Sequence, residues 1–349
     1  MIFLGDIANP NFYKANKNVE INNIFKDKLV IANLEGDLTI NNDFLKKNVV
    51  FNSMNTLDLL NEFNIKVVNL ANNHILDTSE TVRETIEILK KSKISTIGAG
   101  LNEFEASRHL EFSYGGDDYA FFSYGWDLIG CRKPNSNKSG VNLYEPSRNI
   151  VEIRNYINNN KEKKVVVLLH WNYELEIYPQ PMDRQFAHDL IDLGVEAVIG
   201  CHSHCVQGIE VYKNKPIIYS LGNWLFPNGK YFDGKLIFPE ISNLQIAIEL
   251  INGEVICHWH QKLVDGSVVF LNSEDLNDSK KIKELTPYQS YSPDRYISFF
   301  REHRRKKNLL PVFYNYNHEY RNLIKKKFVQ FRHIGIKTVL NLGLKGGPK

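Results

Sequence analysis

Two short apolar segments run directly into histidine: KVVVLLHW at residues 164–171 and AVIGCHSH at residues 197–204. Their aliphatic and β-branched residues predict two buried strands. The amphipathic stretch Asp183–Leu193 between them predicts a helix, and a strand–helix–strand unit is typical of parallel strands in an α/β sheet. Because such sheets bind ligands beyond the carboxyl ends of their strands, a functional site is expected around the histidines that follow, which are His170, His202 and His204.

Three earlier apolar stretches end in polar side chains in the same way. These are Ile2–Gly5 before Asp6, Leu29–Leu34 before Glu35, and Ile65–Ala71 before Asn73 and His74. Each residue alone has a structural explanation, such as a strand-end cap or a turn. Together, the carboxylates, carboxamide and imidazoles are ligands that suit Mn, Fe, Zn or Mg, and the set is large enough for two divalent ions. The sequence therefore predicts a metal site.

Strand-like and helix-like stretches alternate through the first 200 residues. Further predicted strands are Ser95–Ile97 and Tyr119–Tyr124, and further predicted helices are Thr56–Phe63, Glu80–Lys91 and Glu145–Asn159. Hairpins are predicted over Gly208–Leu221 and Leu244–Leu263, the second with an Asn252-Gly253 pair that favours a type I′ turn. This order predicts an α/β fold with one catalytic domain over residues 1–270, followed by a helical, basic extension over residues 271–349.

The composition is that of a folded protein. The 349 residues are 43% hydrophobic and 24% charged, which argues against a disordered or fibrous chain. No run of 18 apolar residues is present, and the first strand leaves no room for a signal peptide before Asp6, so a cytoplasmic location is expected. Cys201 and Cys205 flank the histidine pair; they are either thiolate ligands or, as favoured here, buried packing residues.

Six motifs occur in an order that resembles a known family. They are Gly5-Asp6, Asn33-Leu34-Glu35-Gly36, Leu70-Ala71-Asn72-Asn73-His74 with Asp77, His170-Trp171 with Glu174, Gly200 with His202 and His204, and Tyr219-Ser220-Leu221-Gly222-Asn223. The series is similar to the CapA-type capsule-synthesis (poly-γ-glutamate) family, a branch that resembles the calcineurin-like metallophosphoesterases. The resemblance covers residues 1–265. It implies a four-layer α/β/β/α metallophosphatase-like sandwich.

The resemblance also implies a role for each motif residue. Asp6 and His204 would hold one metal ion, Glu35 would bridge, and Asn73, His170 and His202 would hold a second ion. His74 would be the catalytic imidazole that faces the leaving group, since histidine can donate a proton near neutral pH. Asp77 and Glu174 would accept ring N–H bonds, and Asn223 would touch substrate or metal-bound water. The chain departs from the wider pattern at Ala8, where many metallophosphoesterases have a histidine.

Two functions from different classes follow from these features. The first is a metal-dependent hydrolase that acts in capsule or other cell-surface polymer biosynthesis. It would cleave a phosphoester, or with less support an amide or γ-glutamyl bond, in the polymer or its phosphorylated precursor. The second is a non-catalytic accessory protein of a polymer-synthesis complex, which the departure at Ala8 keeps open. A nucleic-acid phosphodiesterase is a third hypothesis, although no recognised nucleic-acid-binding motif is present.

The C-terminal segment Arg301–Lys349 is strongly basic. It carries 13 lysines and arginines against two glutamates, although the whole chain has a formal net charge of only +3. Within it, Leu323–Leu344 mixes apolar and basic residues in a pattern typical of an interfacial helix. We therefore expect peripheral contact with an anionic membrane, at the inner face of the cell membrane, with a solvated helix packed on the catalytic domain as the alternative.

Overall fold

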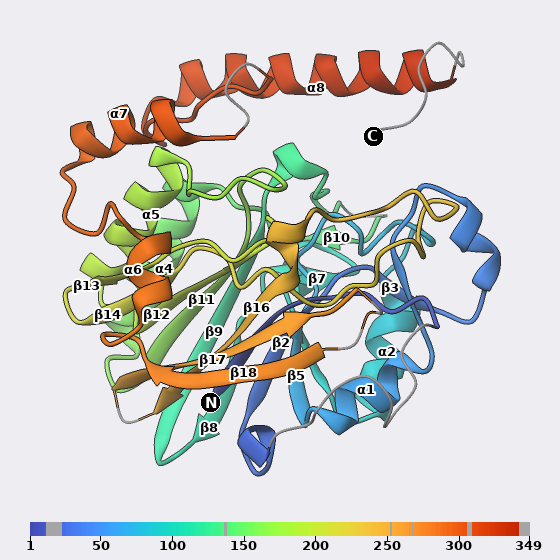
Figure 1. Cartoon of the computed structure of the whole chain (residues 1–349), viewed down its shortest axis with the longest axis horizontal. Coiled ribbons are helices and arrows are strands. Elements are labelled where there is room, and N and C mark those ends of the chain that lie inside the picture. The colour runs from blue at the N-terminus through green and yellow to red at the C-terminus, as the bar shows by residue number, and fades with distance from the viewer. Residues whose placement is uncertain are drawn as a thin grey trace.

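The computed structural model describes residues 1–11, 23–135, 138–251, 253–264, 266, 268–305 and 309–341. Asn252 of the predicted turn lies outside these residues. So does the part of the predicted basic segment that follows residue 341. Two large β-sheets form the centre of the molecule, and helices flank them (Figure 1).

The first sheet has eight strands in the order β18-β17-β16-β1-β2-β5-β6, with β15 beside the end of β1. Strands β1, β2, β5, β6 and β15 are parallel. Strand β16 pairs antiparallel with β1, and β17 and β18 continue the sheet, each antiparallel to the strand before it. Their bounds are β1 Ile2–Ile7, β2 Val30–Leu34, β5 Ile65–Asn69, β6 Ser95–Ile97, β15 Asn223–Leu225, β16 Leu244–Ile251, β17 Glu254–Lys262 and β18 Val268–Asp275.

The second sheet has six strands in the order β13-β14-β12-β11-β9-β8. Its four inner strands are parallel, and both edge strands are antiparallel to their neighbours. The bounds are β8 Leu110–Tyr114, β9 Asp117–Gly125, β11 Lys164–His170, β12 Ala197–Cys201, β13 Ile209–Tyr212 and β14 Lys215–Ile218. Pairs of very short strands lie outside both sheets: β3 Asp37–Thr39 with β4 Phe51–Ser53, and β7 Ala99–Gly100 with β10 Gly140–Val141.

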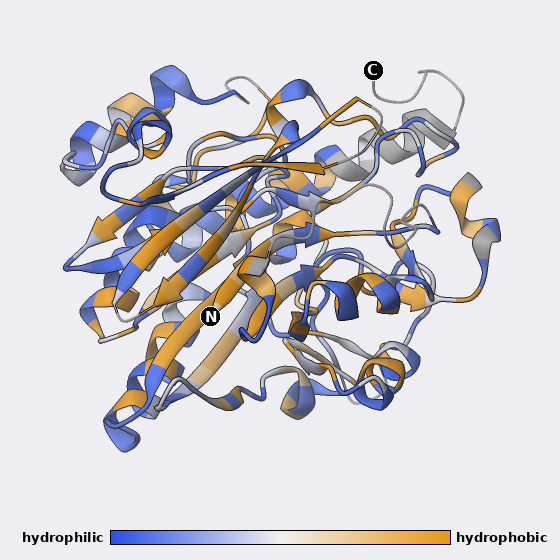
Figure 2. Ribbon diagram, turned by 60° about the horizontal axis from the view of Figure 1, so that its bottom comes forward, coloured by the Kyte–Doolittle hydropathy of each residue, from blue (hydrophilic) through white to orange (hydrophobic). Residues whose placement is uncertain are grey.

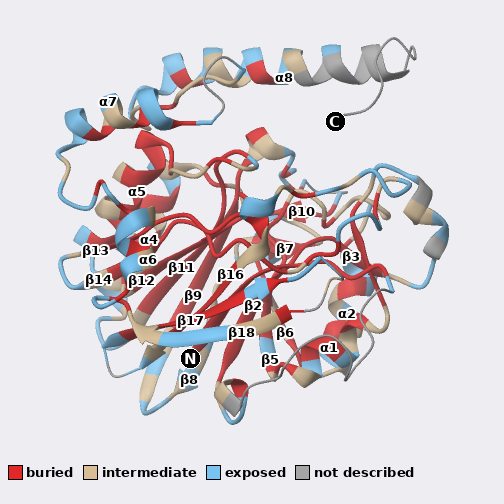
Figure 3. Cartoon of the chain, in the orientation of Figure 1, coloured by how far each residue is buried: buried red, intermediate tan, exposed pale blue. Residues whose placement is uncertain are grey.

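The two sheets pack face to face around a shared apolar core. Phe3 and Val67 of the first sheet lie in the same buried cluster as Val166 and Ile199 of the second. Helices α1 (Thr56–Glu62) and α2 (Arg83–Lys91) cover the outer face of the first sheet, and α4 (Pro146–Asn159) and α5 (Pro181–Asp192) cover that of the second. Figures 2 and 3 show the apolar, buried strands at the centre. The four-layer α/β/β/α arrangement predicted from the sequence is confirmed.

The C-terminal extension begins differently from the prediction. The chain does not become helical at Leu271, because β18 continues to Asp275 and completes the edge of the first sheet. Helices α6 (Lys280–Leu285), α7 (Pro293–His303) and α8 (Glu319–Asn341) follow. The one-turn helix α3 (Glu103–Ala106) lies much earlier in the chain, where it contacts the short strand β7. The division at residue 270 stays a prediction.

The extension packs on the outer helical layer of the second sheet. Tyr296, Phe300, Phe313 and Val329 belong to the same buried cluster as Phe186 of α5. In Figure 1, α7 and α8 lie along one side of the molecule, above α5. Among the described residues, no helix is both long enough and apolar enough to cross a membrane.

Two glycines allow the strands that carry the expected site residues to approach other backbone closely. A Cβ atom on Gly5 would lie 1.9 Å from the carbonyl oxygen of Gly222, and one on Gly200 would lie 2.0 Å from that of Tyr219. At such distances a Cβ atom would overlap the carbonyl oxygen, so only glycine fits at both positions. This close approach sets Asp6 in register with Asn223 on β15.

We predict that Gly5→Ala lowers the free energy of unfolding by about 2–3 kcal/mol, because β1 and the turn before β15 must separate. Chemical denaturation monitored by circular dichroism measures the change. Gly335→Ala in α8 is the matched control, since no atom lies within 4 Å of the added Cβ. It should change stability by no more than about 1 kcal/mol, in the stabilising direction. Equal stability of Gly5→Ala and the native protein would contradict the close-approach argument.

Candidate metal centre

The expected site residues meet where the parallel strands of both sheets end. Asp6 lies near the end of β1, Glu35 directly follows β2, and His170 is the last residue of β11. His202 and His204 follow β12. The sandwich therefore brings four distant stretches of sequence together in one buried cluster, at the edge where α/β sheets bind ligands.

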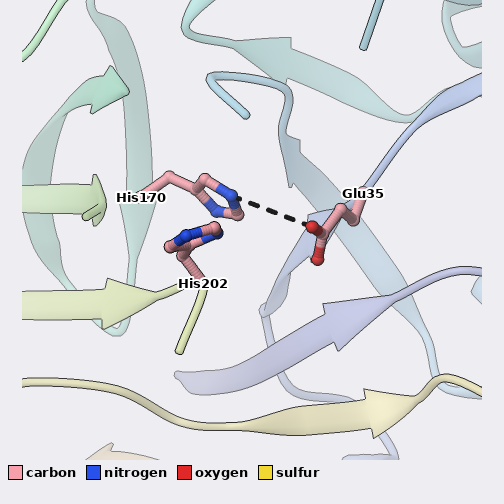
Figure 4. Close-up of side chains that lie close together, drawn as sticks. All are labelled: Glu35, His170 and His202. Carbon is pink, nitrogen blue, oxygen red and sulfur yellow. Dashed lines mark ion pairs between the residues drawn. The ribbon is translucent and has the colours of Figure 1, made fainter. Parts of the chain in front are cut away.

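The cluster contains two groups of side chains that share one carboxylate. Glu35, His170 and His202 form the first group, shown in Figure 4, and Asp6, Glu35 and His204 form the second. Within each group the ligand atoms all lie within 4.8 Å of one another. Glu35 Oε1 lies 3.9 Å from His170 Nε2 and 3.8 Å from His204 Nε2. Glu35 therefore occupies the bridging position between two candidate cation sites.

The environment of Glu35 fits a cation. Its carboxylate is fully buried, and neither oxygen has a hydrogen-bond partner among the residues that the structure describes. Burial raises the pKa of this carboxyl well above its usual range, and the neighbouring charge of Asp6 raises it further. A buried carboxylate without donors is costly unless a positive charge compensates it. The residues present therefore suit one or two divalent metal ions.

The imidazoles of the first group are also suited to metal ligation. Burial lowers the pKa of both His170 and His202 well below the usual value, so both rings are neutral near pH 7. A neutral imidazole has a free lone pair, which a metal requires. In the described part of the chain, Nδ1 of each ring has no hydrogen-bond partner, and His170 Nε2 lies 2.8 Å from the side-chain oxygen of Asn73. Asn73 thus lies beside the first group, and its role as a ligand stays a prediction.

Asp6 and His204 are held by a polar scaffold. Asp6 accepts hydrogen bonds from the Asn33 side chain at 2.8 Å and from the His202 backbone N–H at 3.2 Å. Burial raises the pKa of the Asp6 carboxyl, which His204 and these hydrogen bonds oppose. His204 Nδ1 lies 3.5 Å from Asp6 Oδ2 and 2.9 Å from the side-chain oxygen of Asn223. Asn223 therefore contacts a candidate ligand.

The sequence analysis missed part of this scaffold. Asn69 donates a hydrogen bond at 3.0 Å to Asn33, and Ser123 donates one to Asn69. Asn33 and Asn69 are polar residues at the ends of apolar strands, which is the signal that could have identified them. His202 and His204 have positive φ angles of 95° and 55°, a rare conformation for residues other than glycine. This backbone conformation occurs in the turn that brings both rings to the site.

His74 lies at the accessible side of the cluster. Its Nε2 lies 3.7 Å from Glu35 Oε1, its Nδ1 lies 2.6 Å from Asp77 Oδ2, and its side chain is 18% exposed. Asp77 also accepts a hydrogen bond at 2.9 Å from the Val50 backbone, which fixes the carboxylate. His74 therefore reaches both solvent and the candidate ligands, with Asp77 as its orienting partner.

The expected hydrogen bond from a ring N–H to Glu174 is wrong. Glu174 is exposed, and within the described part of the chain its side chain makes no hydrogen bond. It lies in the turn after β11, where water solvates the carboxylate. Cys201 and Cys205 belong to neither candidate ligand group of the described residues, and burial raises the pKa of both thiols, which agrees with packing rather than ligation.

The fold and the donor set define a class: a four-layer α/β/β/α protein with a candidate dinuclear metal centre at the sheet edge. Residues 7–228 match the family model of the bacterial capsule synthesis protein PGA_cap. The chain therefore belongs to this capsule-synthesis family, as the motifs predicted.

Two curated relatives agree with this assignment. The capsule biosynthesis protein CapA of Bacillus anthracis is 28% identical over 166 residues, which are 47% of this chain and 40% of that protein. The PGA biosynthesis protein CapA of Bacillus subtilis is 31% identical over 173 residues, 48% of this chain and 44% of that protein. The matched region thus spans less than half the length of these relatives.

Among solved structures, a putative 5'-nucleotidase from Staphylococcus aureus matches with a TM-score of 0.42 and 12% identity, over 82% of this chain and 57% of that one. At this level the likeness does not extend to activity.

We predict that Glu35→Gln abolishes stabilisation by added Mn²⁺, because it removes the charge that both ligand groups share. For the native protein, Mn²⁺ at 100 times its Kd should stabilise the folded state by about 2.7 kcal/mol. Thermal unfolding with and without Mn²⁺ measures both effects. Glu254→Gln is the matched control and should keep the full shift, since Glu254 is exposed at the start of β17, away from the candidate ligands. An unchanged shift in Glu35→Gln would exclude the shared carboxylate as a ligand.

Proposed function

We propose that this protein is a metal-dependent phosphoester hydrolase that acts in capsule or other cell-surface polymer biosynthesis. The observation that carries the proposal is the buried, unpartnered carboxylate of Glu35 shared by two ligand groups, with His74 beside it. The family supports the biosynthetic context. The substrate would be the polymer or its phosphorylated precursor, and a cytoplasmic location stays a prediction.

Divalent ions held by these residues would supply an activated water and neutralise charge on the phosphoryl oxygens. The protein residues would perform the remaining tasks. Glu35 would keep two cations close together despite their repulsion. His74, as the imidazolium, would pass the proton on Nε2 to the departing oxygen, and Asp77 would accept the Nδ1–H bond and stabilise the ring charge.

A pocket beside His74 favours an anionic substrate. Its lining includes the acidic residues Asp77 and Glu80 and the basic residues Arg132 and Lys138. Both basic side chains are exposed, and neither makes an ion pair within the described residues. Cations that have no protein partner are available for phosphate or carboxylate groups. This arrangement supports a phosphoester, or another anionic group of the polymer, more than a neutral amide.

The second candidate is a non-catalytic accessory protein of a polymer-synthesis complex. Its support is the side chain at position 8, where alanine is buried and offers no ligand to the ion held by Asp6 and His204. A weakly held ion at that site would leave a structural metal and no turnover. The experiments below separate the two candidates.

We predict that His74→Ala lowers the hydrolysis of phosphodiesters by about 10²–10³-fold with Mn²⁺ present, because the departing oxygen loses its proton donor. The loss should be larger for an alkyl ester than for a p-nitrophenyl ester, whose leaving group needs no proton. Steady-state kinetics with both esters measures the difference, and Asp77→Asn should show the same trend more weakly.

His109→Ala is the control, because His109 packs on Phe122 away from the candidate ligands. His74→Ala must keep the Mn²⁺ thermal shift, which separates loss of chemistry from loss of metal. Absence of His74-dependent turnover of phosphomonoesters, phosphodiesters and γ-glutamyl substrates would favour the accessory role.

We predict that the double variant Arg132→Gln, Lys138→Gln raises KM for an anionic phosphodiester by about tenfold or more, with little change in kcat. The two cations would bind the substrate equally in the ground and transition states, so only KM responds. Lys280→Gln, a change at another exposed lysine, controls for net charge. A fall in kcat with constant KM would argue against substrate binding in this pocket.

A further inference from the structure

Helix α8 carries a row of large apolar side chains on the face that points away from the protein. Tyr320, Ile324, Phe328 and Phe331 are 76%, 53%, 57% and 72% exposed. Their spacings of four, four and three residues place them on one side of an α-helix. Val329, on the opposite side, is fully buried against the body. The inner face of the helix is therefore covered by the body, and the outer apolar row is not.

Basic side chains accompany the exposed row. Lys327 lies within it, and Arg321 and Arg332 lie along its border. Within the described residues, none of the three makes an ion pair or a hydrogen bond. By contrast, Lys325 and Lys326 turn toward the body. Glu319 is the single acidic residue of this helix.

The inward lysines fix the helix in place. Lys326 forms an ion pair with Asp127 at 2.9 Å, and Lys325 lies over the ring of Tyr314 at 4.8 Å. Figure 1 shows α8 as a long rod along one side of the molecule, and Figure 3 shows exposed segments along its outer side. A fixed helix with an uncovered apolar row and free cations beside it is suited to a flat surface that is both apolar and anionic.

We propose that α8 docks parallel to the surface of an anionic lipid bilayer, with Tyr320, Ile324, Phe328 and Phe331 inserted at the interface. Charge complementarity selects this partner, because Arg321, Lys327 and Arg332 would lie at the level of the lipid phosphates. A nucleic acid would use the cations but would leave the row of apolar side chains without a partner. The helix lies on the membrane and does not cross it, in agreement with its polar inner face.

Docking through α8 also sets the orientation of the catalytic body. Asp127, which holds Lys326, lies two residues after the end of β9, and the Trp126 N–H donates a hydrogen bond at 3.0 Å to the carbonyl oxygen of His170. The helix is thus joined to the sheet edge that carries the candidate metal centre. A docked molecule turns this edge toward the lipid surface.

Vesicle co-sedimentation of the full chain tests the proposal. We expect binding to phosphatidylcholine vesicles that contain phosphatidylglycerol, and much weaker binding to phosphatidylcholine alone. The triple variant Arg321→Gln, Lys327→Gln, Arg332→Gln should bind the anionic vesicles about 100-fold more weakly, at about fivefold for each basic residue. The triple variant Ile324→Ser, Phe328→Ser, Phe331→Ser should lose at least about tenfold even at low salt.

Matched controls separate these effects from general charge and hydrophobicity. Lys280→Gln with Lys283→Gln removes exposed lysines on α6, and Phe104→Ser removes an 80%-exposed ring on α3. Both should bind vesicles as the native protein does. All variants should keep a melting temperature close to the native one, because the changed side chains are exposed apart from the half-buried Arg332.

Three results would overturn the proposal: equal binding to both kinds of vesicle, equal binding by the charge variant, or no vesicle binding by the native protein. Self-association that the apolar variant abolishes, without any effect on vesicles, would assign the row to a second copy of the chain. Binding of the native protein to RNA with no vesicle binding would assign the cations to nucleic acid.

Discussion

The structure of the site depends on one buried charge that the protein itself does not compensate. Glu35 is fully buried, neither of its oxygens accepts a hydrogen bond from any described residue, and burial raises its pKa. Folding places this carboxylate beside the imidazoles of His170 and His202. Burial lowers the pKa of both rings, so both are neutral. Such an arrangement is unfavourable for the empty protein and favourable once cations occupy it. The donor set therefore describes a metal centre better than a structural hydrogen-bond network.

The surrounding scaffold is arranged to hold these donors in place. The serine and asparagine side chains behind Asp6 form a chain of hydrogen bonds that runs from Ser123 through Asn69 and Asn33. Close backbone approach at Gly5 and Gly200 brings the ends of β1 and β12 against the segment before β15. Polar networks of this kind fix the orientation of the groups that touch a metal, and loss of one member weakens the site without removing a ligand.

The C-terminal extension also reaches the segment that follows His170. The Tyr173 hydroxyl donates a hydrogen bond at 3.2 Å to the carbonyl oxygen of Pro311, and the Arg305 backbone donates one at 2.9 Å to Glu176. The buried Arg304 guanidinium lies 3.8 Å from the same carboxylate. The predicted helical, basic extension is therefore part of the structure around the site.

The sequence by itself predicted the core strands of both sheets, the four helices that flank them and the candidate ligands. Apolar runs such as Lys164–His170 are short-range signals, and polar residues directly after them, such as Glu35, mark the sheet edge. The family motifs then named residues, far apart in the sequence, that lie together in the observed cluster. Sequence could not determine that β18 continues beyond Leu271, because this strand gains stability only by pairing with β17. Nor could it show that Glu174 turns to solvent while Asp77 meets His74. Those outcomes depend on distances between residues far apart in the chain, and only tertiary packing sets those distances.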